Sequence, residues 1–298
     1  MPSVALATCL GFPDLDEEDR LVIPALRALG IHAVPEIWDD ANVDWSVFDA
    51  VVIRETWDYA ERRPEFLDWL RRVSAATLLL NPASVVEWNT DKRYLRDLVA
   101  ADVPIVPTQF LEPGDDVDAS APPAGYADYV VKPAVSAGSR DTVRYAVDGP
   151  QDVARGHVRR LLDAQRTVMI QPYLDAVDTE GETALLFIGG EFSHAIRKGP
   201  LLERGIEGER VEGLFVQEQI DPREPTDEQL IVADAVLAAV PGGRDALLFA
   251  RVDLISGPDG SPQLLELELT EPSLFLSHGA GAPDRLARAI AARLGSLS

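Results

Sequence analysis

The sequence is poor in cysteine and in long apolar runs, and each shortage excludes a class of protein. Cys9 is the one cysteine among 298 residues, so an internal disulfide bond and a metal site built from cysteines are ruled out. No apolar run approaches the roughly 20 residues that span a bilayer. The start carries no basic segment of a signal peptide, and five acidic residues lie between positions 14 and 19. We therefore expect a cytoplasmic protein with no membrane partner.

Positive charge is also scarce. Fifty acidic residues stand against 27 basic ones, and the formal net charge is −23 at pH 7. This balance argues against nucleic acid and anionic membranes as partners, because both require a basic footprint. An anionic small molecule would instead need a few cations converging on one pocket.

Lysine is almost absent. Of the 27 basic residues 24 are arginine (27 − 3), and the three lysines are Lys92, Lys132 and Lys198. A lysine retained against such a preference indicates a position that needs a compact ammonium group rather than a planar guanidinium. Chance survival is the alternative, so the neighbours of each lysine have to decide between the two.

The first 80 residues show an alternation of predicted strands and helices. Strands predicted over 2–8, 31–37, 48–53 and 77–80 are interleaved with helices over 18–29 and 64–73. This order indicates a small parallel α/β layer, whose ligands bind beyond the carboxyl ends of the strands. Arg54 follows a strand there and is a candidate for gripping a carboxylate. Trp57 and Tyr59 are more simply interpreted as packing aromatics.

The middle of the chain predicts a phosphate-binding loop. A strand over 128–132 ends in Lys132, small residues follow, and a second strand begins near Thr142. Successive backbone N–H groups in such a loop can face phosphate oxygens. It is not a P-loop, because the G-x-x-x-x-G-K-[ST] pattern is absent. A strand over 167–174 is interrupted by Pro172, which predicts a sheet edge with free backbone groups.

The following segments predict a hairpin and a lid. Strands over 182–188 and 191–197 would turn at Gly189-Gly190 and deliver Arg197 and Lys198 together to one end. The glycine-rich stretch 199–213 shows little periodicity, as expected of a mobile lid. Further helices are predicted from Thr90 onward and over 152–164, 226–240 and 283–294.

A second hairpin, over 251–273, carries the densest polar chemistry. Gly257 to Gly260 supply the turn. Because side chains alternate along a strand, Arg251 and Asp253 share one face, as do Glu266 and Glu268, while Leu265, Leu267 and Leu269 take the opposite face. Crowded carboxylates repel one another unless a cation lies among them, and a hard divalent ion would serve. The simpler alternative is the solvated face of a half-buried strand.

Taken in order, these features resemble the ATP-grasp superfamily of ligases over roughly residues 85–295. The resemblance rests on the two lysines at a helix start and before a small-residue loop, the Arg-Lys pair, the glycine-rich stretch, and R-x-D followed by E-x-E. It implies an α/β (α+β) ATP-grasp fold behind a small parallel N-terminal α/β domain. The implied domains are a substrate-side domain (1–88), a central lid subdomain (89–170) and a C-terminal domain with the metal hairpin (171–298).

The resemblance also implies a role for each motif. ATP phosphates would contact Lys92, Lys132 and the loop residues Ser136, Gly138 and Ser139. The adenine edge would meet Gln171 and the backbone of Leu174, and the ribose would meet Glu182, with Asp178 and Glu180 as alternatives. Mg²⁺, or Mn²⁺, would be held by Asp253, Glu266 and Glu268. The catalytic cations facing the transferred phosphoryl group would be Arg251, Arg197 and Lys198. Where the family often has asparagine as the last metal ligand this chain has Glu268, so the number of ions stays open.

Within the superfamily, the segments RETWDY (54–59) and NPASVVEWNTDKRYL (81–95) resemble the glutathione-synthetase-like branch and its enzymes that close D-cycloserine in antibiotic biosynthesis. That resemblance implies a small amino-acid-like substrate. The carboxylate of O-ureido-D-serine would be phosphorylated, the ureido nitrogen would close the ring, and the carbamoyl group would leave as CO₂ and ammonia. Candidate substrate-binding residues are Thr8, Arg54, Asp58, Asn81 and Ser273, with His194 either a further one or a structural histidine.

Three other functions fit parts of the pattern. A peptide or glutathione-type amide ligase would use the same motifs on a different acceptor. A nucleotide-binding regulatory protein would not need the complete set of lysines and carboxylates, and a plain acidic metal-binding protein would leave the lysine positions unexplained. The oligomeric state is open, with a homo-oligomer as one alternative.

Overall fold

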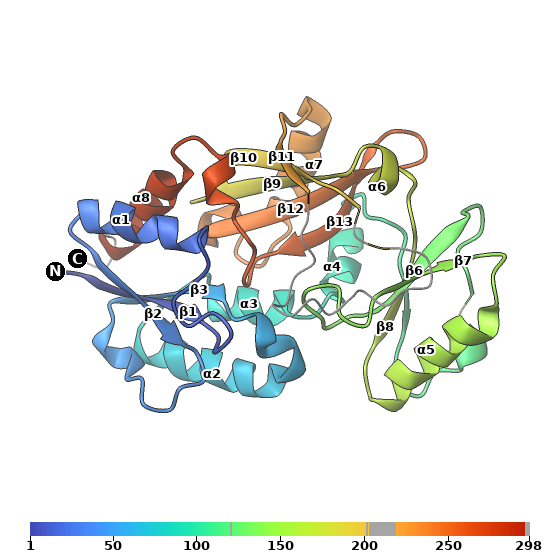
Figure 1. Cartoon of the computed structure of the whole chain (residues 1–298), viewed down its shortest axis with the longest axis horizontal. Coiled ribbons are helices and arrows are strands. Elements are labelled where there is room, and N and C mark those ends of the chain that lie inside the picture. Colours follow the sequence, from blue (N-terminus) through green and yellow to red (C-terminus); the bar gives the residue numbers. More distant parts are fainter. Residues whose placement is uncertain (120, 201, 203–218, 296–298) are drawn as a thin grey trace.

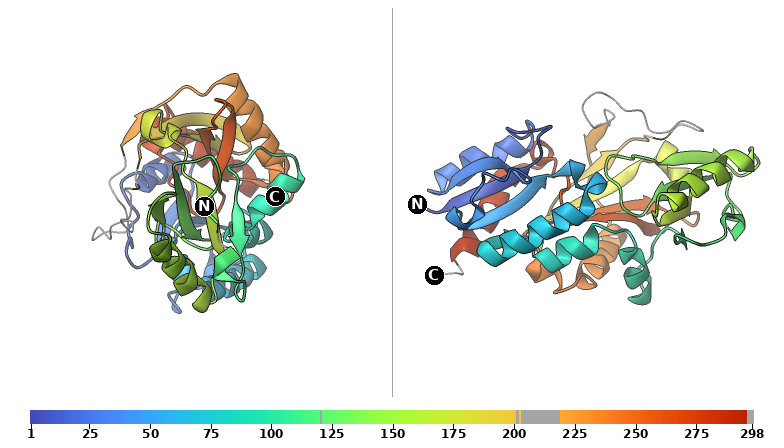
Figure 2. Two further views of the ribbon diagram at one scale, coloured as in Figure 1. Left: turned by 90° about the vertical axis from the view of Figure 1, so that its right-hand side faces the viewer. Right: turned by 90° about the horizontal axis from the view of Figure 1, so that it is seen from below.

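The computed structural model describes the chain except residues 120, 201, 203–218 and 296–298, and it contains three sheets. The N-terminal sheet and the central sheet lie at opposite ends of the molecule, and the C-terminal sheet lies between them (Figures 1 and 2). The N-terminus and the last helix, α8 (Ala282–Gly295), lie beside the N-terminal sheet (Figure 1). No helix in the described part of the chain has the length and apolar character needed to cross a membrane.

The N-terminal sheet is parallel, with strand order β2-β1-β3-β4. Apolar side chains bury both of its faces, which is why its strands are nearly continuous apolar runs. Helices α1 and α8 cover one face and α2 covers the other (Figure 1). The elements are β1 Ser3–Thr8, α1 Val22–Ala28, β2 His32–Ile37, β3 Ala50–Glu55, α2 Arg63–Ala76 and β4 Leu78–Leu80. The predicted parallel layer is therefore confirmed.

The central sheet is antiparallel, with order β5-β8-β6-β7, and α5 packs on β6 and β8. It is preceded by two short helices. The elements are α3 Ala83–Asn89, α4 Tyr94–Ala100, β5 Gln109–Leu111, β6 Asp128–Pro133, β7 Val143–Ala146, α5 Gln151–Asp163 and β8 Val168–Pro172.

Two expectations for this region were wrong. The helix expected to open at Thr90 begins at Tyr94, and the separate helix α3 precedes it. Strand β8 is not at an edge, because it pairs with β5 on one side and β6 on the other. Its pairing with β5 stops at Ile170, however, so the segment with Pro172 does run past the end of that neighbour.

The C-terminal sheet is antiparallel, with order β11-β10-β9-β12-β13, and α7 packs on β12 and β13. Gly189 and Gly190 make the β9–β10 turn with φ of 64° and 85°, a left-handed conformation that glycine adopts without strain. Thr226 and Gln229 form a capping box that starts α7. The elements are α6 Ala176–Thr179, β9 Glu182–Ile188, β10 Glu191–Lys198, β11 Ile220–Pro222, α7 Asp227–Ala238, β12 Phe249–Ser256, β13 Pro262–Glu268 and α8 Ala282–Gly295. Most of the stretch 199–213 predicted as a lid lies outside the described residues.

The N-terminal and C-terminal sheets share one core cluster, whereas the central sheet and α5 also enclose a cluster of their own. One apolar cluster contains Val4 and Leu26 of the N-terminal unit together with Leu186 of β9 and Leu286 of α8. Asn81, at the end of β4, donates to the carbonyl oxygens of Phe249 and Leu269 at 2.9 and 2.8 Å. The sequence pieces 1–88 and 171–298 are thus packed through a shared interior, and the domain boundaries stay a prediction.

Candidate active site

A cavity of about 490 Å³ lies where the three sheets meet, and it collects most of the predicted site residues. Its wall includes the phosphate-loop residues Ser136, Gly138 and Ser139, the adenine-side residues Gln171 and Leu174, and Ser273. The charged residues in the wall are Asp16, Lys92, Lys132, Glu182, Lys198, Arg251, Glu266, Glu268 and Glu271.

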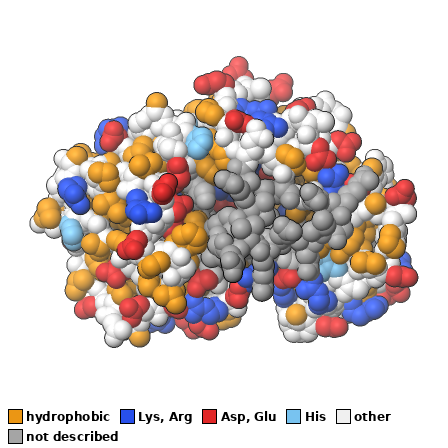
Figure 3. All heavy atoms as spheres, viewed as in Figure 1, with side chains coloured by type: hydrophobic (Ala, Val, Ile, Leu, Met, Phe, Trp, Pro, Cys, Tyr) orange, Lys and Arg blue, Asp and Glu red, His pale blue; other side chains and the backbone are white. Residues whose placement is uncertain are grey.

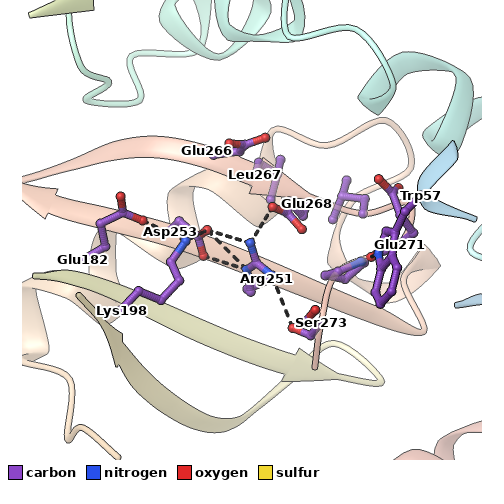
Figure 4. Close-up of polar contacts among 12 residues, drawn as sticks. Trp57, Glu182, Lys198, Arg251, Asp253, Glu266, Leu267, Glu268, Glu271 and Ser273 are labelled. Carbon is purple, nitrogen blue, oxygen red and sulfur yellow. Dashed lines mark hydrogen bonds and ion pairs between the residues drawn. The ribbon is translucent and has the colours of Figure 1, made fainter. Parts of the chain in front are cut away.

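The β12–β13 hairpin places its polar face as predicted. Arg251 pairs in register with Glu268, and Asp253 with Glu266. Arg251 donates to Asp253 (Nε–Oδ1 3.0 Å, Nη2–Oδ2 3.0 Å), to Glu268 and to the carbonyl oxygen of Ser273 (3.3 Å), as Figure 4 shows. One guanidinium therefore holds together the acids on both strands.

The opposite face differs from the expectation at one residue. A β-bulge lies after Asp253, so Leu254 pairs with Leu264 and Leu265 is the extra residue. Leu267 and Leu269 are buried in the core as predicted, whereas Leu265 is half-buried and borders the cavity, whose wall also includes Leu267. A pattern of strict alternation cannot reveal a bulge, which shifts the register by one residue.

The three lysines converge on the same cavity from different elements. Lys92 lies just before α4, and its Nζ is 3.0 Å from the carbonyl oxygen of Ser136 and 3.1 Å from Glu266. Lys198 ends β10, with its Nζ 2.6 Å from Asp253 and 2.7 Å from Glu182 (Figure 4). Lys132 is the last residue but one of β6, and no carboxylate in the described part of the chain lies within ion-pair distance of it.

Among the residues that the structure describes, no ion pair compensates the charge of Lys132. Burial lowers its pKa, attraction to Glu266 works against that shift, and repulsion from Lys92 adds to it. Burial acts in the same direction on Lys92, but attraction to Glu266 outweighs it and the pKa of Lys92 is raised. An ammonium group that is half-buried and has no ion-pair partner is costly, and an anion such as a phosphate would compensate it.

Among the carboxylates, Glu268 and Glu271 carry negative charge that their neighbours do not fully compensate. Burial raises the pKa of Glu268 to about 7, because repulsion from Glu266 and Asp253 offsets the attraction of Arg251. Burial likewise raises the pKa of Glu271 to about 8. Burial acts to raise the pKa of Asp253 too, but Arg251 and Lys198 lower it below its ordinary value.

These two imbalances fit a bound nucleotide with a divalent metal. The acid face supplies oxygen ligands of the kind that Mg²⁺ prefers, and a divalent ion there would relieve the repulsion at Glu268. Anionic phosphates would supply the missing partner of Lys132. The donor set present thus matches both groups.

The loop after β6 is held in an unusual backbone conformation. Gly138, Ser139 and Asp141 have φ of 61°, 56° and 54°. Asp141 is anchored by Arg160 at 3.0 Å and Arg166 at 2.5 Å. The anchored side chain keeps the loop beside the cavity, into which Thr142 also faces.

On the adenine side, Gln171 is buried and donates to the hydroxyl of Thr108 at 2.8 Å, and Leu174 lines the cavity. Of the three acids considered for the ribose, Glu182 lines the cavity. Asp178 is bound to Tyr173 and Arg144 instead, and Glu180 accepts from Ser256.

Several predicted residues lie outside the cavity wall. Arg197 follows Ile196 and precedes Lys198 on β10, so it points to the other face, where it donates to the carbonyl oxygen of Glu180 at 2.6 Å. This position does not support its role as a catalytic cation, which stays a prediction. Asp253 is not in the wall but is linked to it through Lys198 and Arg251.

Four of the substrate candidates have structural partners instead. Arg54 is buried and paired with Asp19 at 2.9 Å, and Asn81 is bonded to the backbone of β12. Thr8 donates to the carbonyl oxygen of Phe12, and Asp58 accepts from Trp38 and Arg62. His194 contacts the carbonyl oxygens of Leu274 and Phe275, as a structural histidine would. Of the five substrate candidates, Ser273 does line the cavity.

Sequence reasoning missed a second group of wall residues. Trp57, Tyr59 and Asp16 come from the N-terminal unit, and Glu271 and Phe275 come from the segment after β13. Trp57 donates from Nε1 to the carbonyl oxygen of Glu271 at 3.1 Å, which joins the two segments. The signal available in the sequence was the position of Trp57 and Tyr59 after β3, where ligands of parallel sheets bind.

Comparison with known proteins gives this geometry a family. Residues 4–81 match the family described as D-cycloserine synthetase DcsG, N-terminal domain. The cycloserine biosynthesis protein DcsG of Streptomyces lavendulae is 41% identical over 305 residues, which cover 99% of each chain. The chain belongs to the D-cycloserine synthetase family. The crystal structure of D-cycloserine synthetase DcsG superimposes with a TM-score of 0.87 at 38% identity, covering 98% of this chain and 99% of that one.

The wider fold is shared with other ATP-grasp proteins. The D-alanine–D-alanine ligase from Bacillus anthracis complexed with ATP superimposes with a TM-score of 0.64 at 16% identity, covering 100% of this chain and 98% of that one. This D-cycloserine synthetase family member thus has the ATP-grasp fold and is an ATP-dependent ligase of cycloserine biosynthesis, as the sequence predicted.

Proposed function

We propose that the enzyme uses ATP and Mg²⁺ to activate the carboxylate of O-ureido-D-serine and close it to D-cycloserine. The observation that supports this most is the meeting of three lysines with Asp253, Glu266 and Glu268 at one cavity. Phosphoryl transfer requires neutralised phosphate oxygens and an aligned acceptor, with little covalent help from the protein.

In this proposal Lys92 and Lys132 hold phosphate oxygens, together with backbone N–H groups of the loop 136–142. Gln171, Leu174 and Glu182 hold the nucleoside. Asp253, Glu266 and Glu268 hold the metal, with either Mg²⁺ or Mn²⁺ suited to these ligands. ATP and metal, when bound, supply the phosphoryl group that turns the substrate carboxylate into an acyl phosphate and the charge that shields it.

The remaining residues act on the substrate end. Arg251 and Lys198 compensate charge at the carboxylate that receives the phosphoryl group, and Ser273 borders the same region. The ureido nitrogen then attacks the acyl carbon as phosphate leaves. With one water, the carbamoyl group leaves as CO₂ and ammonia.

ADP release from ATP, Mg²⁺ and O-ureido-D-serine, with the cyclised product identified by mass, tests this directly. A panel of small amino acids and pairs of D-alanine serves as the control for other ligase activities. Lys132→Ala should weaken nucleotide binding about ten- to a hundredfold, as expected for a lost hydrogen bond between charged groups. The proposal is wrong if no substrate elicits ADP and Lys132→Ala leaves nucleotide affinity unchanged.

A further inference from the structure

A second group of acids lies beside the cavity, apart from the metal hairpin. Acceptor oxygens of Asp16, Asp19 and Glu55 all lie within 4.8 Å of one another. Asp16 comes from the loop after β1 and lines the cavity. Glu55 ends β3 and is 0% exposed, and Asp19 is also buried. None of the functions assigned above uses this cluster.

Asp19 has its charge compensated. Arg54 donates to both of its oxygens, from Nε at 3.0 Å and from Nη2 at 2.9 Å. The same guanidinium donates to the carbonyl oxygen of Pro272 at 2.8 Å. This bond ties the cluster to the segment that brings Glu271 and Ser273 into the cavity wall.

Asp16 and Glu55 are not compensated in this way. Oδ1 of Asp16 accepts from the Asp19 N–H at 2.7 Å, and Oε1 of Glu55 accepts from the Asp16 N–H at 2.8 Å. Oε2 of Glu55 is buried and has no hydrogen-bond partner among the residues that the structure describes. Burial beside Asp19 and Asp16 raises the pKa of Glu55, so the free protein keeps a proton on this buried group, and a ligand with N–H donors and positive charge could take the place of that proton.

A primary ammonium group suits these acceptors better than a divalent metal. Both Asp19 oxygens are occupied by Arg54, so a metal would find too few of the six or more oxygen ligands that Mg²⁺ or Ca²⁺ requires. The neighbouring guanidinium would also repel a doubly charged ion more strongly. An ammonium group carries one charge and three donors, which two carboxylates and a water or carbonyl oxygen can satisfy.

We propose that Asp16, supported by Glu55, binds the primary ammonium group of the substrate. This rests on the proposed function, because the substrate there is an amino acid. Asp16 faces the cavity and contacts the ligand directly, and Glu55 acts behind it as a positioning residue. The cations of the cavity would take the carboxylate end of the same molecule.

The test compares two ligands on three proteins by calorimetry. The ligands are O-ureido-D-serine and 3-(ureidooxy)propanoate, which is the same molecule without its amino group. The proteins are the wild type, Asp16→Asn and the matched control Glu17→Gln, which removes one exposed charge from the same loop. Asparagine retains an oxygen that can accept from the Asp19 N–H, and Asp16→Ser is the second variant if Asp16→Asn does not fold.

We expect the wild type and Glu17→Gln to bind the amino compound about ten- to a hundredfold more tightly than the deamino compound. In Asp16→Asn this preference should fall to a few-fold, with affinity for ATP and for the deamino compound unchanged. Equal affinity of the wild type for both ligands, or binding of neither, overturns the proposal. So does an equal loss for both ligands in Asp16→Asn, which indicates a structural role only. Binding of the amino compound without ADP formation would instead contradict the proposed function and leave the ammonium site standing.

Discussion

At the scale of single residues, the cavity wall contains charged side chains whose position is unfavourable in the free protein. Lys132 is a cation with no ion-pair partner among the described residues, and Glu268 and Glu271 have raised pKa values. Such residues lower the stability of the free protein and become favourable only when a ligand of opposite charge is present. Acidic and basic side chains are interspersed on the described surface in Figure 3, whereas Lys132, Glu268 and Glu271 are half-buried in the cavity wall.

Glu55 gives a prediction about stability and pH. Burial raises its pKa from the ordinary 4.5 to about 9, and repulsion from Asp19 and Asp16 adds to this shift, whereas the hydrogen bond from the Asp16 backbone N–H acts against it. Between pH 5 and 8 the unfolded chain releases this proton and the folded chain retains it, so the free energy of unfolding falls as the pH rises. Glutamine has no titratable proton at this position. The free energy of unfolding of Glu55→Gln should therefore rise relative to that of the wild type by up to about 1.4 kcal/mol for each pH unit between pH 5 and 8.

Urea denaturation of the ligand-free protein at pH 5, 6.5 and 8 measures this difference. Glu17→Gln, with an exposed side chain, is the control and should run parallel to the wild type. If the curve for Glu55→Gln is parallel as well, Glu55 is ionised in the folded protein and our interpretation of the cluster has to change.

At the scale of elements, the alternation of side chains along β10 decides which of two neighbouring cations faces the cavity. Lys198 and Arg197 are neighbours on β10, yet Lys198 contacts Asp253 and Glu182 while Arg197 lies on the other face. Lys198→Gln should lower kcat/KM for ADP formation about 10²- to 10³-fold, in the range found when one electrostatic donor is removed. Arg197→Gln, the matched change one residue away, should stay within a few-fold of the wild type.

Steady-state assays of the two variants at saturating Mg²⁺ check this. Comparable losses in both would show that Arg197 acts in catalysis as well. If Lys198→Gln lowers kcat/KM only slightly, Lys198 is not a catalytic residue.

At the scale of the whole molecule, the shared core couples the two ends of the chain. Leu286 of α8 is 1% exposed and lies in the cluster that contains Val4 and Leu26. Leu286→Ala should cost about 2–5 kcal/mol of stability, the usual range for such a cavity. All five tryptophans lie between positions 38 and 88, so their fluorescence reports on the N-terminal unit, whereas ellipticity at 222 nm reports on all helices.

We expect Leu286→Ala to lower the urea midpoint by the same amount with both probes. Ile231→Ala on α7 is the control, because its side chain is 67% exposed and its loss should change stability by less than about 0.5 kcal/mol. A fluorescence midpoint that does not move while the ellipticity midpoint falls would mean that the N-terminal unit unfolds alone.

Much of the fold could be predicted because its signals are local. The parallel strands β1 to β4, the glycine turn after β9 and the paired acids of β12 and β13 follow from apolar runs, turn residues and the period of two along a strand. Helix α3 was not predicted, because its seven residues Ala83–Asn89 are too short to show a clear helical period. The bulge at Leu265 left no mark in the pattern of apolar residues.

By itself, the sequence determined the chemistry that this protein carries: three lysines among 27 basic residues, the paired acids of one hairpin and the loop after Lys132. Only the tertiary structure decided which of these residues meet. It turned Arg197 away, enclosed Arg54 with Asp19, and brought Asp16 and Glu271 into the cavity wall. The physical reason is that contacts between residues over 200 positions apart, such as Arg54 with Pro272, depend on how sheets pack and not on any local period.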